Sequence, residues 1–190
     1  MSSKPVGILL AAGKSQRFNS NKLLHPIINN TPMFLVAAQT LASVLPGSVV
    51  VINPTLKTYT AQLEHMGLHV VINEQAEQGM GSSIACGVSA SKDACGWLIT
   101  LADMPYIKTE TLTLLANKLS DGADIIAPVF NQQRGHPVGF NSTYKNELME
   151  LNKDVGARYI IEKHQQQLEL LVTNDEGVVQ DVDYPDDIHT

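Results

Sequence analysis

The sequence Val6-Gly7-Ile8-Leu9-Leu10-Ala11-Ala12-Gly13-Lys14-Ser15 decides the expected fold. Its first half, residues 6–10, is an apolar run, which is typical of a strand buried on both faces of a sheet. The run ends in small residues and a glycine, so we expect the strand to lead into a loop. Residues 31–44 then carry apolar side chains at helical spacing, with Pro32 at the first helical position. A strand, a loop and a helix therefore follow one another.

The same alternation continues along the chain. Short β-branched and apolar runs predict strands, and longer runs with helical spacing predict helices. The predicted strands are residues 49–52, 69–72, 97–101, 124–130, 138–140, 168–173 and 178–182, and the further helices are residues 56–66, 82–90, 109–119, 142–151 and 155–164. This order predicts a three-layer α/β/α fold with a mainly parallel, Rossmann-like sheet. A length of 190 residues without an internal repeat or linker leads us to expect a single domain, residues 1–190.

The composition excludes several classes of protein. Hydrophobic residues make up 44% and charged residues 17% of the chain, which is typical of a globular protein. The net charge of -6 and the lack of a basic tract argue against a nucleic-acid partner. No apolar run approaches the ~18 residues of a membrane span. Without a recognisable signal peptide, and with only Cys86 and Cys95, the chain is expected in the cytoplasm.

The loop after the first strand is a candidate phosphate-binding site, because α/β sheets bind ligands at the carboxyl ends of their strands. Small residues let backbone N–H groups approach a phosphate chain, and Lys14, Arg17 and Lys22 supply cations. Gly13-Lys14-Ser15 also matches the end of a Walker A loop. That motif requires glycine where the chain has Ile8, and Gly7 is one residue too early, so we do not favour a Walker A loop.

Four later segments are further candidates, and the first three have an ordinary structural alternative. Asp103 follows the predicted strand 97–101 and could hold Mg²⁺, or could simply cap a turn. Asp181 and Asp183 share one face of the predicted strand 178–182, although acidic pairs are usually solvated. Residues 79–83 could contact the edge of a base, or form a glycine turn capped by Ser82. His136 lies between Gly135 and Pro137 in a constrained loop.

Taken together, these segments resemble the nucleotidyltransferases of the molybdenum cofactor cytidylyltransferase type. The loop from Leu10 to Lys22 is similar to the LAAG-x-S-x-R-F-G…K signature of that family, with Asn19 in place of the usual glycine. Asparagine tolerates positive φ better than other non-glycine residues. Further matching segments follow in the same order: residues 79–83, Leu101-Ala102-Asp103-Met104-Pro105, residues 135–140, Asp154-Val155-Gly156-Ala157-Arg158 and residues 181–187.

The resemblance implies a role for each candidate residue. Asp103 and Asp183 would hold Mg²⁺, with Asp181 nearby, and Arg17, Lys22 and Asp103 would be the catalytic residues. His136 would contact the acceptor substrate. The nucleotide would be bound by Arg17, Lys22 and the segments Leu10, Ala11, Ala12, Gly13, Lys14, Ser15 and Gly79, Met80, Gly81, Ser82, Ser83.

The resemblance also implies the reaction. The Leu-Ala-Ala-Gly form of the first loop accompanies cytidine rather than guanine, so the expected reaction transfers CMP from CTP to a phosphorylated acceptor, molybdopterin, and releases pyrophosphate. A molybdoenzyme would receive the product. Two alternatives stay open: a transferase of the same fold that uses GTP or a sugar or polyol phosphate, and a non-catalytic chaperone that delivers the cofactor to a molybdoenzyme.

Overall fold

The computed structural model describes residues 4–13, 21–152, 156–184 and 187–188. The predictions made for Lys14, Ser15, Arg17, Asn19 and Asp154 lie outside these residues. None of the helices in the described part of the chain combines the length and the apolar character that crossing a membrane requires.

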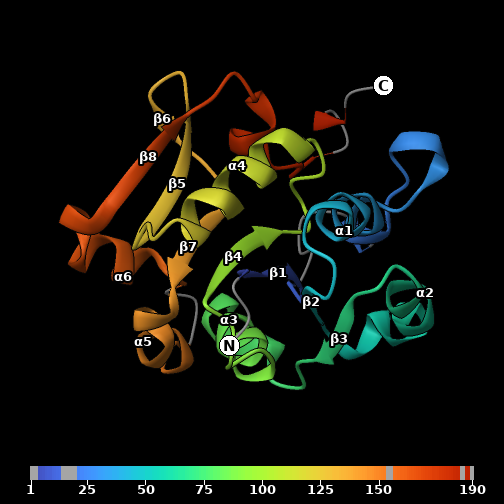
Figure 1. Cartoon of the computed structure of the whole chain (residues 1–190). Coiled ribbons are helices and arrows are strands. Elements are labelled where there is room, and N and C mark those ends of the chain that lie inside the picture. The colour runs from blue at the N-terminus through green and yellow to red at the C-terminus, as the bar shows by residue number, and fades with distance from the viewer. Residues whose placement is uncertain (1–3, 14–20, 153–155, 185–186, 189–190) are drawn as a thin grey trace.

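The expected alternation of strands and helices is present (Figure 1). The strands are β1 (Val6–Ala11), β2 (Val49–Ile52), β3 (His69–Ile72), β4 (Gly96–Leu101), β5 (Ile125–Phe130), β6 (Gln133–Arg134), β7 (Val138–Asn141) and β8 (Leu168–Val172). The α-helices are α1 (Met33–Val44), α2 (Thr60–His65), α3 (Met80–Ala90), α4 (Thr109–Ser120), α5 (Lys145–Met149) and α6 (Arg158–Lys163). Short 3-10 helices include η1 (Lys22–Leu24), η3 (Pro54–Tyr59) and η8 (Glu176–Val179).

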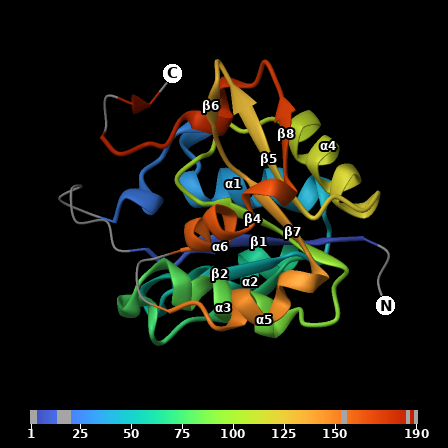
Figure 2. The same ribbon diagram turned by 90° about the vertical axis from the view of Figure 1, so that its left-hand side faces the viewer.

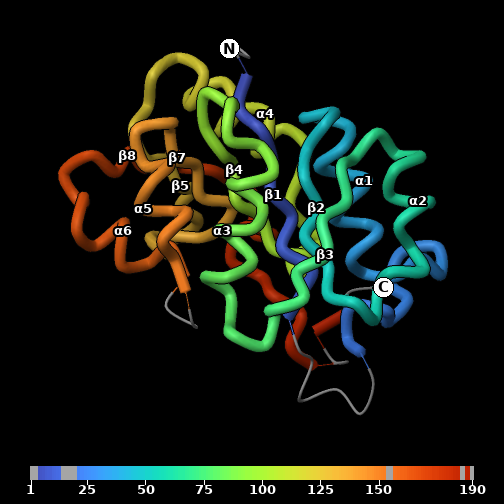
Figure 3. The backbone as a smooth tube through the Cα atoms, turned by 90° about the horizontal axis from the view of Figure 1, so that it is seen from below, coloured from blue at the N-terminus to red at the C-terminus, as the bar shows by residue number. Residues whose placement is uncertain are grey.

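The strands form one sheet in the order β3-β2-β1-β4-β7-β5, and β5 also pairs with β6 and β8. Neighbours β1, β2, β3 and β4 pair in parallel, as do β5 and β8, whereas β6 and β7 run antiparallel to their partners. In Figure 3 the strands follow one another across the molecule from β3 to β8. Because β1 and β4 are adjacent and parallel, the loops after them leave from the same edge of the sheet.

Helices cover both faces of the sheet, so the predicted three-layer fold is confirmed. Side chains alternate along β1: Leu9 belongs to a core cluster with α1, α2 and α4, and Ile8 belongs to a second cluster with α3, α5 and α6. Figure 2 shows α1 and α4 on one side of the strands and α3 and α5 on the other. Both faces of β1 are fully buried, which explains its continuous apolar sequence.

Some predicted elements differ from the structure. The expected strand at residues 178–182 is wrong: η8 and an extended segment take its place. Asp175 causes the change locally, because its side chain accepts a hydrogen bond from the N–H of Gly177 and caps η8. Between the predicted strands 124–130 and 138–140 the structure has a further short strand, β6, which pairs with the end of β5. Helix α1 begins at Met33, one residue after Pro32.

Residues 174–184, which we name the C-terminal strap, cross the carboxyl edge of the sheet. The Asp175 carboxylate is 2% exposed and accepts hydrogen bonds from the N–H of Lys108 (2.9 Å) and the hydroxyl of Thr111 (2.7 Å). A Cβ added to Gly177 would lie 2.3 Å from the carbonyl oxygen of Tyr106, so only glycine allows this close approach. The strap is therefore fixed against the loop between β4 and α4.

We expect Asp175→Ala to lower the free energy of unfolding by about 3 kcal/mol, because buried N–H and hydroxyl donors lose a charged acceptor. Urea denaturation measures the change. The control is Glu176→Ala, which removes the neighbouring exposed carboxylate and should change the free energy of unfolding by less than about 0.5 kcal/mol. Equal stabilities of the two variants would contradict this role for Asp175.

Candidate active site

Three side chains far apart in the sequence meet at the carboxyl edge of the sheet. The ammonium group of Lys22 lies 2.9 Å from Oδ2 of Asp103 and 2.8 Å from Oδ1 of Asp183. The Lys22 side chain is 14% exposed, against 27% for Asp103 and 36% for Asp183. The structure thus brings together Lys22 and the two carboxylates that the sequence singled out.

Local backbone structure positions each of the three residues. Lys22 begins η1, which Asn21 caps by accepting a hydrogen bond from the N–H of Leu23. Asp103 follows β4, and its carbonyl oxygen accepts a hydrogen bond from the N–H of Val182 in the C-terminal strap.

Asp183 is held by a turn at the end of the strap. Oδ2 of Asp187 accepts hydrogen bonds from the N–H groups of Asp183 (2.9 Å) and Tyr184 (2.7 Å). Asp181, expected near the metal, is exposed, and the buried Val182 separates it from Asp183. The strap therefore orients Asp183, and not Asp181, toward Lys22.

The charge of Lys22 is stabilised by its two partners. Burial alone would lower the pKa of Lys22, but the hydrogen bonds and negative charges of Asp183 and Asp103 outweigh this effect and raise the pKa above its ordinary value. The side chain is therefore protonated throughout the neutral pH range. The single positive charge of Lys22 faces two negatively charged carboxylates. The cluster therefore keeps a net negative formal charge, which favours binding of a further cation.

The donor set suits a magnesium ion. Asp103 and Asp183 offer hard carboxylate oxygens, and Mg²⁺ typically takes one or two carboxylates together with phosphate oxygens and water. Both carboxylates are partly exposed, so a hydrated ion could reach them. Among the described residues there is no cluster of three or more His, Cys, Asp or Glu side chains that could form a complete protein cage. The pair fits a metal whose remaining ligands come from a substrate.

The described part of the first loop presents backbone rather than side chains. Leu10, Ala11 and Ala12 are buried in the sheet, and the carbonyl oxygen of Ala12 accepts a 3.3 Å hydrogen bond from the side chain of Asn53. Gly13 is exposed, and no atom of the described residues lies within 4 Å of the place where its Cβ would stand. A Gly13 N–H group free of side-chain cover is compatible with the predicted phosphate-binding role.

The segment Gly79–Ser83 starts α3, and its hydroxyl groups already have partners inside the protein. The side-chain amide of Asn73 donates to the hydroxyl oxygens of Ser82 and Ser83, each at 3.0 Å. The Ser82 hydroxyl is also 2.8 Å from the carbonyl oxygen of Gly79. These contacts fix the start of α3, the segment predicted to contact the edge of a base.

Sequence reasoning missed Asn53 and Asn73. Both follow the same four-residue pattern, since β2 and β3 each end in Val-Val-Ile and continue with asparagine. Two identical endings on neighbouring parallel strands would have indicated paired polar groups at the carboxyl edge.

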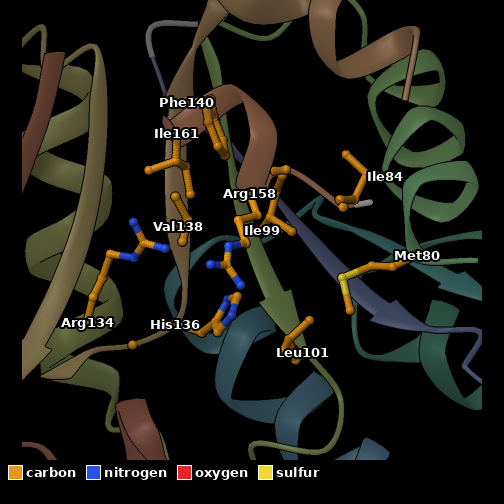
Figure 4. Close-up of a pocket in the computed structure, with 13 residues that line it drawn as sticks. Met80, Ile84, Ile99, Leu101, Arg134, His136, Val138, Phe140, Arg158 and Ile161 are labelled. Carbon is orange, nitrogen blue, oxygen red and sulfur yellow. The ribbon is translucent and has the colours of Figure 1, made fainter. Parts of the chain in front are cut away.

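A cavity of about 280 Å³ lies next to the carboxyl end of β4, between α3, β7 and α6 (Figure 4). Its floor and walls are mostly apolar, and the side chains of Arg134, His136 and Arg158 lie along it. Met80, predicted to bind the nucleotide, projects into this cavity from the start of α3. The structure therefore places Met80 and His136 in the lining of the same cavity.

His136 links the cavity to the carboxylates. Its N–H donates to the carbonyl oxygen of Val178 in the C-terminal strap, and a Cβ added to Gly135 would lie 2.0 Å from the same oxygen. Burial lowers the pKa of the His136 side chain, and the negative charges of Asp103 and Asp181 oppose this only in part. The ring is therefore neutral at pH 7. Its Nδ1 atom is buried and has no hydrogen-bond partner among the described residues.

These features define the class of protein. The mainly parallel sheet, the exposed Gly13 just after β1, and the cluster of Lys22, Asp103 and Asp183 at the carboxyl edge are features expected of a nucleotidyltransferase. The family model of the MobA-like NTP transferase domain matches residues 7–168, and the chain belongs to this family. The chain is accordingly a nucleotidyltransferase, and the resemblance found in the sequence is confirmed. The matched range contains Lys22, Asp103 and His136 and ends before Asp183.

Individual proteins show the same relationship. The chain is 30% identical to the purine catabolism protein PucB of Bacillus subtilis (strain 168), covering 96% of this chain and 93% of PucB. It is 27% identical to a protein of Geobacillus sp. (strain WCH70) named probable molybdenum cofactor guanylyltransferase, over 65% of this chain and 63% of that protein. A manganese complex of Rv0371c from Mycobacterium tuberculosis has the same fold, with a TM-score of 0.80, 22% identity and coverage of 97% and 95% of the two chains.

Proposed function

We propose that this nucleotidyltransferase transfers CMP from CTP to the phosphate group of molybdopterin and releases pyrophosphate. The observation that carries the proposal is the meeting of Lys22, Asp103 and Asp183 at the carboxyl edge of the sheet, from which the chain also leaves β1 toward the exposed Gly13. We also propose that residues 1–190 act as one nucleotidyltransferase domain. Both core clusters are built on the same sheet, which supports this.

The chemistry needs little beyond alignment and charge neutralisation. An oxygen of the acceptor phosphate attacks the α-phosphorus of CTP, the bond from that phosphorus to the oxygen bridging the β-phosphate breaks, and pyrophosphate leaves with the electron pair. The attacking phosphate is already an anion, so no general base is required. Positioning and electrostatic stabilisation then account for the catalysis.

The chain's own residues have distinct parts in this scheme. Lys22 and Arg17 neutralise the phosphates, and the first loop, with Gly13, Lys14 and Ser15, positions them through its N–H groups. Asp103 and Asp183 hold Mg²⁺, which supplies positive charge at the phosphates when it is bound. A divalent cation is supported by the manganese complex of a protein with the same fold. His136 contacts the acceptor, since it lies between the carboxylates and the cavity.

The choice of CTP rests on the Leu-Ala-Ala-Gly loop, because the family resemblance implies that alanine rather than glycine at position 12 accompanies cytidine. The main alternative nucleotide is GTP, because one relative is named a guanylyltransferase. We expect CTP to be preferred over GTP by at least about tenfold in kcat/KM, which corresponds to roughly 1.4 kcal/mol in the transition state. A pyrophosphate-release assay with Mg²⁺, molybdopterin and each of the four nucleoside triphosphates measures the preference.

The same assay separates the remaining candidates. A sugar phosphate replaces molybdopterin in a parallel reaction, and a reaction without any acceptor gives the background. Activity with GTP alone would contradict the choice of nucleotide, and activity only with the sugar phosphate would contradict the acceptor. Tight binding of molybdopterin without pyrophosphate release would instead favour a carrier that delivers the cofactor to a molybdoenzyme.

A further inference from the structure

Strand β8 forms an exposed edge of the sheet. Among the described residues it pairs only with β5, and Figure 1 shows it at the outer side of the molecule. Its sequence, Leu-Glu-Leu-Leu-Val, contains no lysine or proline, and its register with β5 is continuous, without a bulge. Lysine, proline and bulges are common features by which proteins keep edge strands from pairing with another chain. The edge strand β8 carries none of these features.

The backbone of β8 presents a row of hydrogen-bonding groups on its open side. In a parallel pair of strands, alternate residues direct their N–H and C=O groups toward the neighbouring strand, and the residues between them direct these groups away from it. The N–H of Thr173, just after β8, donates to the carbonyl oxygen of Val129 in β5 at 3.0 Å. By this alternation, Leu168, Leu170 and Val172 direct their N–H and C=O groups away from β5. Each of these residues therefore offers one donor and one acceptor to a further strand.

The apolar side chains of these three residues lie on one face of the sheet and are covered only at the beginning of the strand. Leu168 is partly buried and packs on the core cluster that contains Ile160 and Ile161 of α6. Because side chains alternate along a strand, Leu170 and Val172 lie on the same face as Leu168. Leu170 is 54% exposed and Val172 is 82% exposed, so exposure increases along the strand. The apolar stripe is therefore left open toward its carboxyl end.

A second copy of the chain matches this edge in an antiparallel orientation. With a two-fold axis at Leu170, the two Leu170 residues lie opposite each other, and Leu168 of each copy lies opposite Val172 of the other. All three outward-facing residues then form hydrogen-bonded pairs, and each pair exchanges two N–H···O bonds. A register displaced by two residues in either direction would leave one of the three without a partner in β8. With the axis at Leu170, α6, which covers Leu168, is brought beside the open Val172 of the other copy.

Charge is compatible with the same register. Glu169 is the single charged residue of β8, and it is exposed. With the axis at Leu170, Glu169 of each copy lies opposite Leu171 of the other, so like charges do not face each other directly. An axis at Glu169 would instead place two carboxylates opposite each other, which is unfavourable. Hydrogen bonding and charge therefore both favour pairing that is centred on Leu170.

We propose that two copies of this chain form a dimer by antiparallel pairing of β8, centred on Leu170, so that their sheets join into one. An identical strand supplies both the matching row of backbone groups and the α6 cover that Val172 lacks. Strand β8 is parallel to β5, and β5 is parallel to β4 because β7 pairs antiparallel to both. The clusters of Lys22, Asp103 and Asp183 in the two copies therefore lie at opposite edges of the joined sheet. The dimer goes beyond the proposed function and does not depend on the nucleotide or the acceptor.

Sedimentation equilibrium of the full chain over a series of concentrations gives the Kd of the dimer. The wild type should sediment with twice the chain mass of 20.6 kDa. Leu170→Lys should raise the Kd by at least about hundredfold, because two leucines leave the interface and two positive charges face each other. The matched control Leu114→Lys adds the same charge at a leucine of α4 that is 51% exposed, and it should leave the Kd unchanged. Circular dichroism and the thermal midpoint report whether the variants are folded.

Mixing two variants tests the register of the pairing. Leu170→Glu should dissociate as Leu170→Lys does, whereas an equimolar mixture of the two should dimerise with a Kd at least about tenfold lower than that of either variant alone. Opposite charges then face each other at the axis. A wild type that sediments as a monomer, or a dimer that survives Leu170→Lys, would overturn the proposal. An equal loss in Leu114→Lys, or a mixture no more associated than its components, would overturn it as well.

Discussion

Asp103→Asn should lower the rate of pyrophosphate release by at least about 10³-fold. The substitution keeps the size of the side chain and removes the negative charge that faces Lys22 at 2.9 Å. Loss of this carboxylate leaves Asp183 as the only one of the pair that can hold a divalent cation at the phosphates. The carbonyl oxygen of Asp103, which binds the N–H of Val182, is unaffected, so the C-terminal strap should stay in place.

Stopped assays of pyrophosphate release at saturating CTP measure this effect, and titration with Mn²⁺ followed by electron paramagnetic resonance measures metal binding separately. The matched control is Asp121→Asn, which removes an exposed aspartate at the end of α4. The control should retain normal turnover. If Asp103→Asn turned over normally, the metal assignment would be wrong.

Lys22→Met should lower kcat by about 10²- to 10³-fold, the usual effect of losing one preorganised group that stabilises transition-state charge. The same variant should bind Mn²⁺ more tightly than the wild type when no nucleotide is present. In the structure the Lys22 ammonium neutralises both carboxylates at 2.9 and 2.8 Å, so a metal must compete with it. Turnover and metal affinity therefore change in opposite directions.

Because kcat and Mn²⁺ affinity are expected to change in opposite directions, the Lys22→Met variant separates a role at the active site from a structural role. A residue with a merely structural role would lower both quantities together or neither. The control Lys57→Met removes an exposed lysine of η3 and should alter neither kcat nor the Mn²⁺ affinity. Weaker Mn²⁺ binding in Lys22→Met would show that Lys22 does not compete with the metal, and unchanged kcat would exclude it from catalysis.

The layered fold could be predicted because its signals are local. The apolar run of β1 and the helical spacing of α4 each reflect burial that recurs with the period of the element itself. The strand order and the antiparallel insertion of β7 between β4 and β5 could not be read in this way. The strand order depends on which strand edges pair in the folded protein, and the periodicity of a single segment does not determine its pairing partner.

The failed strand at residues 178–182 shows the same limit. Val178 and Val182 are buried, as the strand prediction required. The side chain of Asp175 nevertheless holds the preceding segment in a different conformation, through its cap on η8 and its contacts with Lys108 and Thr111, more than 60 residues away. Asp103 and Asp183, the proposed metal ligands, could be singled out from their motifs. The bridging position of Lys22 between them, the partners of Ser82 and Ser83, and the arginines of the cavity arise only when distant segments meet.

The central claim is that Lys22, Asp103 and Asp183 form the centre at which the triphosphate and its metal are bound. Anomalous diffraction from crystals of the full chain grown with Mn²⁺ and a non-hydrolysable CTP analogue tests it most directly. We predict one Mn²⁺ peak coordinated by both Asp103 and Asp183, with the Lys22 ammonium moved from the carboxylates to the phosphates. A Mn²⁺ peak that touches neither aspartate, or an analogue bound away from the first loop, would contradict the account.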